Sequence, residues 1–254
     1  MEKYAVITGA SSGIGKEFAK LLSLNGYHLI LVARRKEKLQ ELETELHTIC
    51  DIFVADLSLE KDCLALYDFI KNMKIDIFIN NAGFGDCCHF IDGNLEKEMN
   101  MIRVNVQAVH LLTKLILSHM YKEDYGFILN VASSAGLMPA GPYMSTYYAT
   151  KAYVTSLTQG IAEELRKQHS HVYVGCLCPG PVDTEFNQIA EVEFSLKGIS
   201  AKYCVHYAYQ MMMKRKVVIV PSWKMKIAVI GGHFLPRQWL VRIAAHQQKK
   251  KMYR

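Results

Sequence analysis

The sequence predicts an α/β fold: a single Rossmann-type, doubly wound parallel sheet of about seven strands with helices on both faces. Short, continuously apolar runs alternate along the chain with helix-length amphipathic stretches, as expected for parallel strands that helices cover on both sides. A glycine-rich turn follows the first run, at the carboxyl end of a strand, where such sheets bind ligands. Because the 254 residues show neither a repeat nor a linker, we expect one domain over residues 1–254.

The expected strands are short apolar runs, at residues 4–7, 29–32, 52–54, 75–79, 127–131, 172–178 and 217–220. Between them, apolar residues recur at helical spacing. The expected helices cover residues 15–25, where Gly26 stops the helix, and residues 36–48, 60–73, 95–120 and 146–168.

The N-terminus enters a strand at once and lacks the long apolar core of a signal peptide. Among the seven cysteines, Cys87 and Cys88 are adjacent, and Cys176 and Cys178 are two apart. Neither pair has the Cys-x-x-Cys spacing of a zinc site. We therefore expect reduced, mostly buried thiols, no metal, and a cytoplasmic protein.

Charge is unevenly distributed along the chain. From Phe194 onward there are thirteen Lys or Arg residues and no acidic residue, whereas the first 193 residues hold 17 basic and 24 acidic residues, a net of −7. The basic tail is either simply solvated or attracted to an anionic membrane surface, nucleic acid or an acidic substrate. Since no nucleic-acid recognition motif accompanies it, no nucleic-acid partner is expected.

The turn after the first strand reads Thr8-Gly9-Ala10-Ser11-Ser12-Gly13-Ile14-Gly15, and a helix follows. Glycines let the backbone approach a pyrophosphate closely, and the helix N-terminus offers free N–H groups. The position of the turn, at the first strand-to-helix junction, predicts a dinucleotide site. Its candidate residues are Gly9, Ser11, Ser12, Gly13, Ile14 and Gly15.

The second strand ends at Ala33, and Arg34 and Arg35 follow. An NAD-preferring site usually has a carboxylate here for the ribose 2′-hydroxyl. Guanidinium groups suit a 2′-phosphate instead, because their planar fork binds phosphate oxygens in pairs. The sequence favours NADP(H) over NAD(H), with Arg34 preferred to Arg35 as the phosphate ligand. The alternative is a solvated helix start.

Further candidates follow the third and fourth strands. Asp56 and Leu57 come after the third, and Asn81, Ala82 and Gly83 come after the fourth. Both segments fall at carboxyl ends of strands, which is why a cofactor role is assigned to them. Asp56 could equally be a helix N-cap or a turn residue.

Tyr147 and Lys151 are four residues apart in a helical stretch and so share a face. A phenol has a free pKa of about 10 and transfers protons poorly near neutrality. A nearby ammonium would lower that pKa. Ser134 lies at the end of the fifth strand, thirteen residues before Tyr147.

These motifs, with Asn105 and the segment Pro179-Gly180-Pro181-Val182-Asp183-Thr184, occur in the order seen in classical short-chain dehydrogenases/reductases. The sequence resembles that family over roughly residues 3–184. The resemblance implies that Tyr147 is the general acid in reduction and the base in oxidation, while Ser134 binds the substrate oxygen. Lys151 would lower the Tyr147 pKa and hold the nicotinamide ribose, Asn105 would hold a water, and Thr184 would anchor the carboxamide. Pro179, Gly180 and Val182 would complete the cofactor site.

Residues 185–254 are expected to form a substrate loop and a basic C-terminal extension. Aromatic residues and Met are frequent in this part of the chain, at Phe186, at Phe194 and in the stretch 203–213. The loop before the catalytic helix adds Leu137, Met138 and Tyr143. Such a wall favours a bulky lipophilic substrate; helix packing is the competing explanation. Leu235, Trp239, Leu240 and Ile243 recur at helical spacing beside Arg237, Arg242 and the lysines 249–251. This stripe is typical of an interfacial helix, a subunit contact or a pocket cap.

The leading hypothesis is therefore an NADP(H)-dependent oxidoreductase of lipophilic secondary alcohols and ketones, first a hydroxysteroid or bile acid. A 3-oxoacyl reductase acting on carrier-bound or CoA-bound chains is the nearest alternative. A non-catalytic NADP-binding regulator is the alternative from another class, and intact Ser134, Tyr147 and Lys151 weigh against it. A homodimer or homotetramer is expected, with peripheral membrane contact through the basic tail left open.

Overall fold

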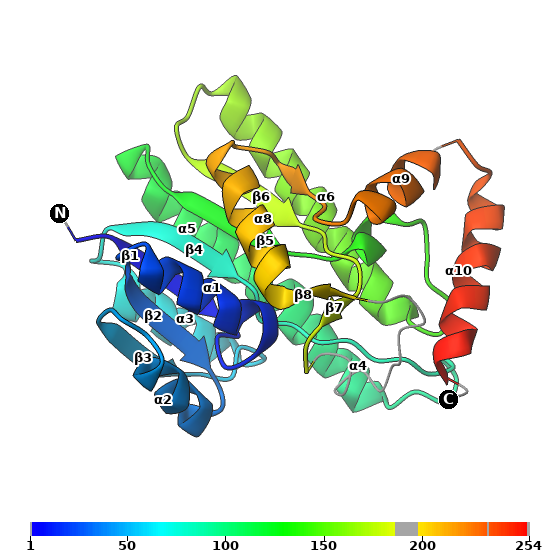
Figure 1. Ribbon diagram of the computed structural model, residues 1–254, viewed down its shortest axis with the longest axis horizontal. Coiled ribbons are helices and arrows are strands. Elements are labelled where there is room, and N and C mark those ends of the chain that lie inside the picture. The colour runs from blue at the N-terminus through cyan, green and yellow to red at the C-terminus, as the bar shows by residue number, and fades with distance from the viewer. Residues whose placement is uncertain (1, 186–197, 233, 253–254) are drawn as a thin grey trace.

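The computed structural model describes residues 2–185, 198–232 and 234–252, the last three of these by their backbone alone. Within these residues, seven parallel strands form one sheet in the order β3-β2-β1-β4-β5-β6-β9. Helices cover both faces of this sheet (Figure 1). The strand order reverses between β1 and β4, which creates a crevice at the carboxyl ends of the strands. The predicted fold class is confirmed.

The strands are short and apolar, and each lies within a few residues of its predicted position. They are β1 (Tyr4–Thr8), β2 (His28–Ala33), β3 (Cys50–Val54), β4 (Ile75–Asn80), β5 (Phe127–Val131), β6 (Tyr173–Leu177) and β9 (Val218–Ile219). A second, two-stranded sheet pairs β7 (Val182–Asp183) with β8 (Ile199–Ser200) in parallel. This small sheet fixes the segment that follows β6 beside the crevice.

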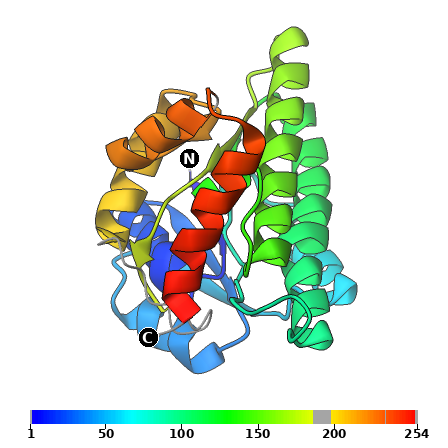
Figure 2. The same cartoon turned by 90° about the vertical axis from the view of Figure 1, so that its right-hand side faces the viewer.

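Helices α1 (Gly13–Leu24), α2 (Lys36–Thr44) and α8 (Ala201–Met213) pack on one face of the sheet. Helices α3 (Glu60–Ile70), α5 (Val109–Glu123) and α6 (Ser145–Lys167) pack on the other. Figure 2 shows the long helices α5 and α6 on the side of the sheet opposite α1 and α8. Helix α1 ends where predicted because Gly26 adopts a left-handed φ of +76°, a common helix stop.

The helix predicted for residues 95–120 is interrupted in its middle. The chain forms α4 (Leu95–Ile102), then the π-helical segment η1 (Arg103–Ala108), then α5. A π-helical turn inserts one extra residue per turn and often occurs at functional sites. Asn105 lies inside this turn and is fully buried, so the interruption turns a polar side chain inward.

Two further helices lie beyond the sheet. Helix α9 (Trp223–Gly232) and helix α10 (Arg237–Met252) follow β9, and α10 lies at one edge of the molecule (Figures 1 and 2). The predicted apolar stripe of this tail is mostly on the outer face, since Trp239 is 61% exposed and Ile243 46%. Leu240, a member of the predicted stripe, is buried and forms the inner face of α10 together with Ala244 and Gln248. No helix in the described ranges is long and apolar enough to cross a bilayer.

Candidate active site

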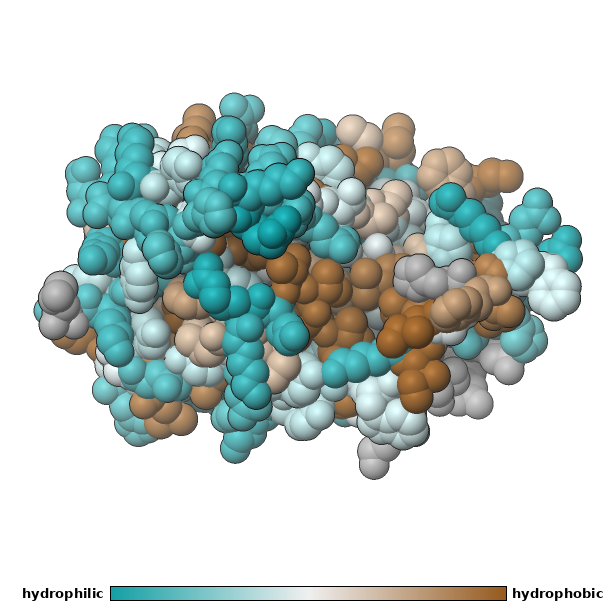
Figure 3. All heavy atoms as spheres, turned by 90° about the horizontal axis from the view of Figure 1, so that it is seen from above, coloured by the Kyte–Doolittle hydropathy of each residue, from teal (hydrophilic) through white to brown (hydrophobic). Residues whose placement is uncertain are grey.

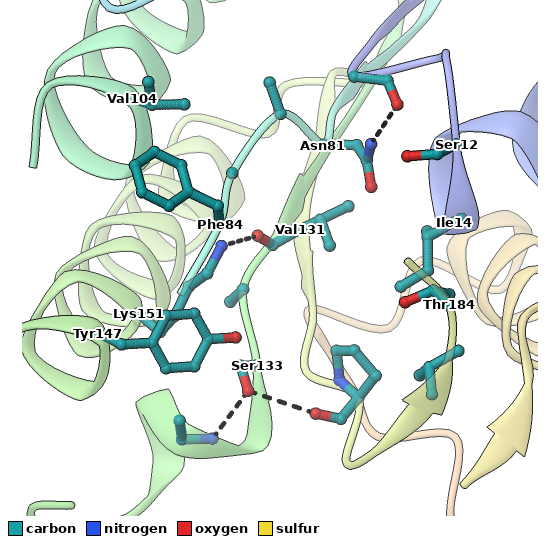
Figure 4. Close-up of a pocket in the computed structure, with 18 of the residues that line it drawn as sticks. Ser12, Ile14, Asn81, Phe84, Val104, Val131, Ser133, Tyr147, Lys151 and Thr184 are labelled. Atoms are coloured by element: carbon teal, nitrogen blue, oxygen red, sulfur yellow. Dashed lines mark hydrogen bonds between the residues drawn. The ribbon is translucent and has the colours of Figure 1, made fainter. Parts of the chain in front are cut away.

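One large cavity of about 720 Å³ opens at the carboxyl ends of the central strands. Its walls come from the turn after β1, the ends of β2, β4, β5 and β6, and helices α6, α9 and α10. Figure 4 shows Tyr147, Lys151 and Ser133 at one side of this cavity and Ser12, Ile14 and Thr184 at the other. The topology therefore brings segments that are far apart in sequence around one space.

The turn after β1 is shaped to leave room for a ligand close to the backbone. Gly9 and Gly13 adopt φ values of +65° and +54°, which residues with a Cβ rarely adopt. A Cβ on Gly15 would collide with the carbonyl oxygen of Gly9, so Gly15 lets helix and turn pack tightly. Ser12 is the N-cap of α1 and makes no capping hydrogen bond with its side chain. The first N–H groups of α1 thus lie where an anion can bind.

Asn81 stabilises this turn. Its side-chain amide donates to the carbonyl oxygens of Thr8 (2.9 Å) and Gly9 (3.2 Å). The backbone N–H groups of Asn81 and Ala82 donate to the Thr8 hydroxyl at 2.9 and 3.0 Å. These bonds tie the end of β4 to the end of β1 and so fix the floor of the crevice. Asn80, by contrast, is buried and donates to the Asn130 side chain at 3.2 Å, which joins β4 to β5.

Two arginines border the cavity after β2. Arg34 and Arg35 are both exposed and both line it. Arg35 donates to the Ser11 hydroxyl at 3.1 Å and forms an ion pair with Glu185 at 3.0 Å. The guanidinium of Arg35 is thereby already held beside the glycine-rich turn.

Asp56 and Leu57 line the same side of the cavity. The Asp56 carboxylate accepts a hydrogen bond from the Ser58 backbone N–H at 3.0 Å, and the Asp56 N–H donates to Asp62 at 2.8 Å. Asp56 thus has the turn role that its position allowed, and it borders the cavity as well.

Tyr147 is buried, and burial raises the pKa of its phenol to about 12, while a hydrogen bond with Ser133 acts in the opposite direction. The expectation that the Tyr147 pKa is lowered is therefore wrong for this structure, because desolvation of the phenolate outweighs the stabilising contacts. At neutral pH the phenol is protonated and able to donate.

The serine beside Tyr147 is Ser133, not Ser134. Ser133 forms the side-chain hydrogen bond with the phenol, and it also accepts from the Ala135 N–H at 3.1 Å. Figure 4 shows Ser133 below the Tyr147 ring, with dashed lines from its hydroxyl to the Ala135 N–H and to the Pro179 carbonyl oxygen, to which it donates at 3.5 Å. Ser134 also lines the cavity, and its backbone N–H donates to the carbonyl oxygen of Pro179 at 2.8 Å. The sequence-based prediction chose Ser134 because it lies thirteen residues before Tyr147, the spacing expected from the family resemblance, whereas Ser133 lies fourteen residues before it.

Lys151 lies under Tyr147 on the same helix, with its Nζ 5.9 Å from the centre of the phenol ring. The ammonium donates to the Val131 carbonyl oxygen at 2.9 Å. Burial lowers the pKa of Lys151 to about 8. A Cβ on Gly83 would lie 3.2 Å from Nζ and 2.9 Å from Asn105 Oδ1, so Gly83 leaves space for both side chains.

Asn105 lies behind Lys151 rather than in the cavity wall. Its amide donates to the Phe84 carbonyl oxygen (2.8 Å) and the Thr150 hydroxyl (3.1 Å), and its Oδ1 accepts from the Phe84 N–H at 3.1 Å. The π-helical turn of η1 allows this inward orientation. The side chain therefore joins the loop after β4 to the helix that carries Tyr147 and Lys151.

The remaining predicted cofactor residues close the cavity from the β6 side. Pro179, Gly180, Val182 and Thr184 all line it. The Thr184 side chain lies against the glycine-rich turn, since a Cβ on Gly13 would be 3.1 Å from it. Of the predicted site residues, Gly15 and Asn105 are the two that do not line the cavity.

The sequence left a pocket cap open as one explanation of the C-terminal stripe, but it did not single out Gln247, Gln248 or Tyr148. Gln247 and Gln248 of α10 line the cavity together with Tyr148. Gln248 donates from its amide nitrogen to the Tyr148 hydroxyl at 2.6 Å. Helix α10 thus caps one end of the cavity. Of the predicted wall, Phe186 and Phe194 lie outside the described residues. The prediction is wrong for the rest of the wall, because Leu137, Met138, Tyr143 and residues 203–213 do not line the cavity, and residues 203–213 pack in α8 on the sheet face that α1 covers.

Comparison with known proteins places the chain in a family. A model of the short chain dehydrogenase family matches residues 3–193. An uncharacterized oxidoreductase of Staphylococcus epidermidis is 34% identical over 192 residues, which cover 74% of this chain and 81% of that protein. A very-long-chain 3-oxoacyl-CoA reductase of Anas platyrhynchos is 33% identical over 203 residues, which cover 75% of this chain and 63% of that protein.

A solved structure shows the same architecture over nearly the whole chain. The short-chain dehydrogenase of Sphingobium yanoikuyae, in complex with NADPH, superposes with a TM-score of 0.82 at 29% identity and covers 94% of this chain and 95% of its own. The family match, the sheet order and the grouping of Tyr147, Lys151 and Ser133 agree with one another. The chain belongs to the short-chain dehydrogenase family of oxidoreductases.

Proposed function

We propose that this chain is an NADP(H)-dependent oxidoreductase that interconverts a ketone and a secondary alcohol on a bulky lipophilic substrate. The observation that supports the proposal is a single cavity that has residues suited to bind a dinucleotide on one side and residues suited to transfer a proton on the other. One side has a glycine-rich turn at the start of α1 with two arginines, and the other has buried Tyr147, Ser133 and Lys151.

In the reductive direction, Tyr147 donates its phenolic proton to the carbonyl oxygen of the substrate. With a pKa of about 12 the phenol carries that proton at neutral pH, as it would at its ordinary pKa of about 10, and Ser133 supplies a second hydrogen bond to the same oxygen. A bound nicotinamide would supply the hydride. We assign to Ser133 the role that the sequence gave to Ser134, because Ser133 has the contact with Tyr147.

Lys151 and Asn105 support this proton donor. Lys151, with its pKa of about 8, is mainly an ammonium at neutral pH, and it would hold the ribose hydroxyls of the cofactor. Asn105 touches neither the cavity nor Tyr147 in the contacts described above, so we propose it as a positioning residue that fixes the loop around Phe84 against α6.

For the cofactor, Gly9, Ser11, Ser12, Gly13 and Ile14 would surround the pyrophosphate, and Thr184 would lie near the nicotinamide end. Arg34 and Arg35 would bind a 2′-phosphate. Support comes from the contact between Arg35 and Ser11, which sets a cation beside the turn, and from the NADPH bound to the Sphingobium relative.

The substrate side of the cavity includes apolar residues such as Phe84, Val104, Met144 and Met225. We propose a hydroxysteroid or bile acid as the first substrate class, since a rigid multi-ring ketone would fill such a space. A 3-oxoacyl-CoA is the second candidate, favoured by the Anas relative and by the basic tail.

Purified protein should be mixed with NADPH and, separately, with steroid ketones, oxidised bile acids and 3-oxoacyl-CoA esters, and NADPH fluorescence followed. We expect turnover of at least one multi-ring ketone. Turnover of the acyl-CoA alone would move the assignment to the second candidate. If no ketone were consumed while NADPH bound, the non-catalytic regulator would become the better account.

The outer face of α9 and α10 supports a proposal about assembly. It carries exposed Trp223, Ile227, Ile230, Trp239 and Ile243, and Figure 3 shows hydrophobic residues gathered toward the side of the molecule that carries these helices. We propose that this face joins subunits of a homodimer or homotetramer, with residues 185–254 acting as loop and cap within one domain. Peripheral membrane contact is the competing use of this face.

We propose a cytoplasmic location, to which the seven free cysteines are suited.

A further inference from the structure

Helix α10 places a polar side chain in an otherwise packed interface. Leu240, Ala244 and Gln248 are spaced four residues apart and form the buried face of the helix. Gln248 is only 4% exposed, although glutamine usually lies at the surface. A buried amide gives up its hydrogen bonds to water, which an apolar residue would not, so the amide of Gln248 needs hydrogen-bond partners within the protein or from a ligand.

The amide of Gln248 has one partner and lacks another. Its nitrogen donates to the Tyr148 hydroxyl at 2.6 Å. Its Oε1 is buried and has no hydrogen-bond partner, the one such side-chain oxygen or nitrogen in the described part of the chain. A buried acceptor without a donor is unfavourable, so the site is complete only when a donor arrives.

Tyr148 holds the amide in place. Its ring packs against the backbone of Gly141, where an added Cβ would collide with it. It also lies edge-on to Tyr147, with the ring centres 6.4 Å apart. Tyr147, Tyr148 and Gln248 all line the same cavity, so the Gln248 side chain belongs to the wall of the catalytic cavity, although its unsatisfied Oε1 is covered in this conformation.

We propose that Gln248 is a specificity-determining residue, whose Oε1 accepts a hydrogen bond from a substrate hydroxyl remote from the reacting carbonyl. Rotation about the terminal amide torsion, which is broad for glutamine, would turn Oε1 toward the cavity and move Nε2 away from the Tyr148 hydroxyl, so that the bond from the substrate hydroxyl replaces the bond to Tyr148. The inference rests on the proposed function and narrows it. It favours a multi-ring ketone with a second hydroxyl over a plain acyl chain, which has no hydroxyl to offer there.

The test compares two ligands that differ in one group. The first is a steroid ketone with a second hydroxyl distant from the ketone, and the second is the same ketone with that hydroxyl replaced by hydrogen. Dissociation constants are measured by calorimetry on the protein saturated with NADP⁺, which has no hydride to transfer to a ketone, so binding is measured without turnover. The parent protein should bind the hydroxylated ketone more tightly by about five- to tenfold, the worth of one hydrogen bond.

Gln248→Met keeps the length of the side chain and removes the acceptor. We expect it to abolish the preference by weakening binding of the hydroxylated ketone alone. Gln248→Leu repeats the test with a different apolar shape. His246→Met, on the exposed face of the same helix, is the matched control and should retain the preference. NADPH affinity should be the same in all four proteins.

Several results would overturn the inference. One is a parent protein that binds both ketones equally, and another is a Gln248→Met variant that keeps the preference. Equal weakening of both ketones would show that Gln248 only shapes the cavity. Because binding is measured apart from turnover, its outcome is separate from that of the proposed function. A selective protein that never consumed NADPH would retain the inference and lose the oxidoreductase assignment.

Discussion

Ser133 forms the side-chain hydrogen bond with the buried phenol of Tyr147, although Ser134 lies at the predicted spacing. The two serines have different conformations. Ser133 is extended, with φ of −169°, and caps the short 3₁₀ helix η2 (Ser134–Leu137), of which Ser134 is the first residue. This difference of one position decides which serine hydroxyl lies beside the Tyr147 phenol.

Replacing the two serines one at a time tests this assignment. Ser133→Ala should lower kcat by roughly a hundredfold, since it removes a hydrogen-bond donor aimed at the oxygen on which charge develops. Ser134→Ala is the matched control and should lower kcat much less. NADPH binding, followed by fluorescence, should survive in both. A larger loss of kcat in Ser134→Ala would restore the assignment made from the sequence.

Cofactor preference tests the two arginines. NADPH should bind more tightly than NADH. Arg34→Ala should reduce the ratio of the two affinities by about ten- to a hundredfold, which corresponds to about 1.5–3 kcal/mol for one charged contact to phosphate. Fluorescence titration with both cofactors measures it. Equal affinities in the parent protein would contradict the NADP(H) assignment.

Arg35 provides a second test of the same pocket. If Arg35→Ala reduces the preference for NADPH over NADH and Arg34→Ala does not, the phosphate ligand is Arg35, which Ser11 and Glu185 already hold in place. Glu185→Gln removes the carboxylate that pairs with Arg35. It should leave NADPH affinity unchanged or raise it, because Arg35 is then released for phosphate. A fall in affinity would mean that Glu185 positions Arg35 productively.

The buried ammonium of Lys151 predicts a pH dependence of stability. Its pKa falls from 10.5 to about 8 because burial disfavours the charge. Between these values the unfolded chain binds more protons than the folded one, so the free energy of unfolding rises with pH in that window. Relative to Lys151→Met, the parent should gain about 2 kcal/mol between pH 7 and about pH 9.5. Urea unfolding of both proteins measures this difference, and a constant difference would contradict the burial of the charge.

If the exposed apolar face of α9 and α10 joins subunits, polar substitutions on it should weaken the oligomer. Trp239→Ser and Ile243→Ser replace two exposed apolar side chains and should convert the oligomer into smaller species, as measured by light scattering. Leu24→Ser, at an exposed apolar position in α1, is the control. If assembly is unchanged but binding to anionic vesicles falls, this face contacts membrane instead.

Much of the fold could be predicted because its signals are local. Continuous apolar runs marked all seven strands of the main sheet, and Gly26 marked the end of α1. The π-helical turn at Asn105 was missed, since residues 95–120 read as one amphipathic helix. A single extra residue in a turn leaves almost no trace in a hydrophobic pattern.

The site was predictable where a residue follows directly from a strand end or a helical spacing, as for Gly9, Tyr147 and Lys151. Gln248 was not, because its partner Tyr148 is 100 residues away. The buried face of α10 also includes a small residue and a polar one, Ala244 and Gln248. The apolar pattern around Trp239 and Ile243 therefore indicated the opposite face of the helix.

Transfer of deuterium tests the central claim most directly. NADPH deuterated at the reactive position of its nicotinamide ring is incubated with a multi-ring ketone and the parent protein, and the product alcohol is analysed by mass spectrometry. We predict one deuterium on the carbinol carbon, and a rate at least about a hundredfold lower with Tyr147→Phe, which loses the proton donor. A product without deuterium, or equal rates in the two proteins, would contradict the account of Tyr147 as the proton donor in hydride transfer from NADPH.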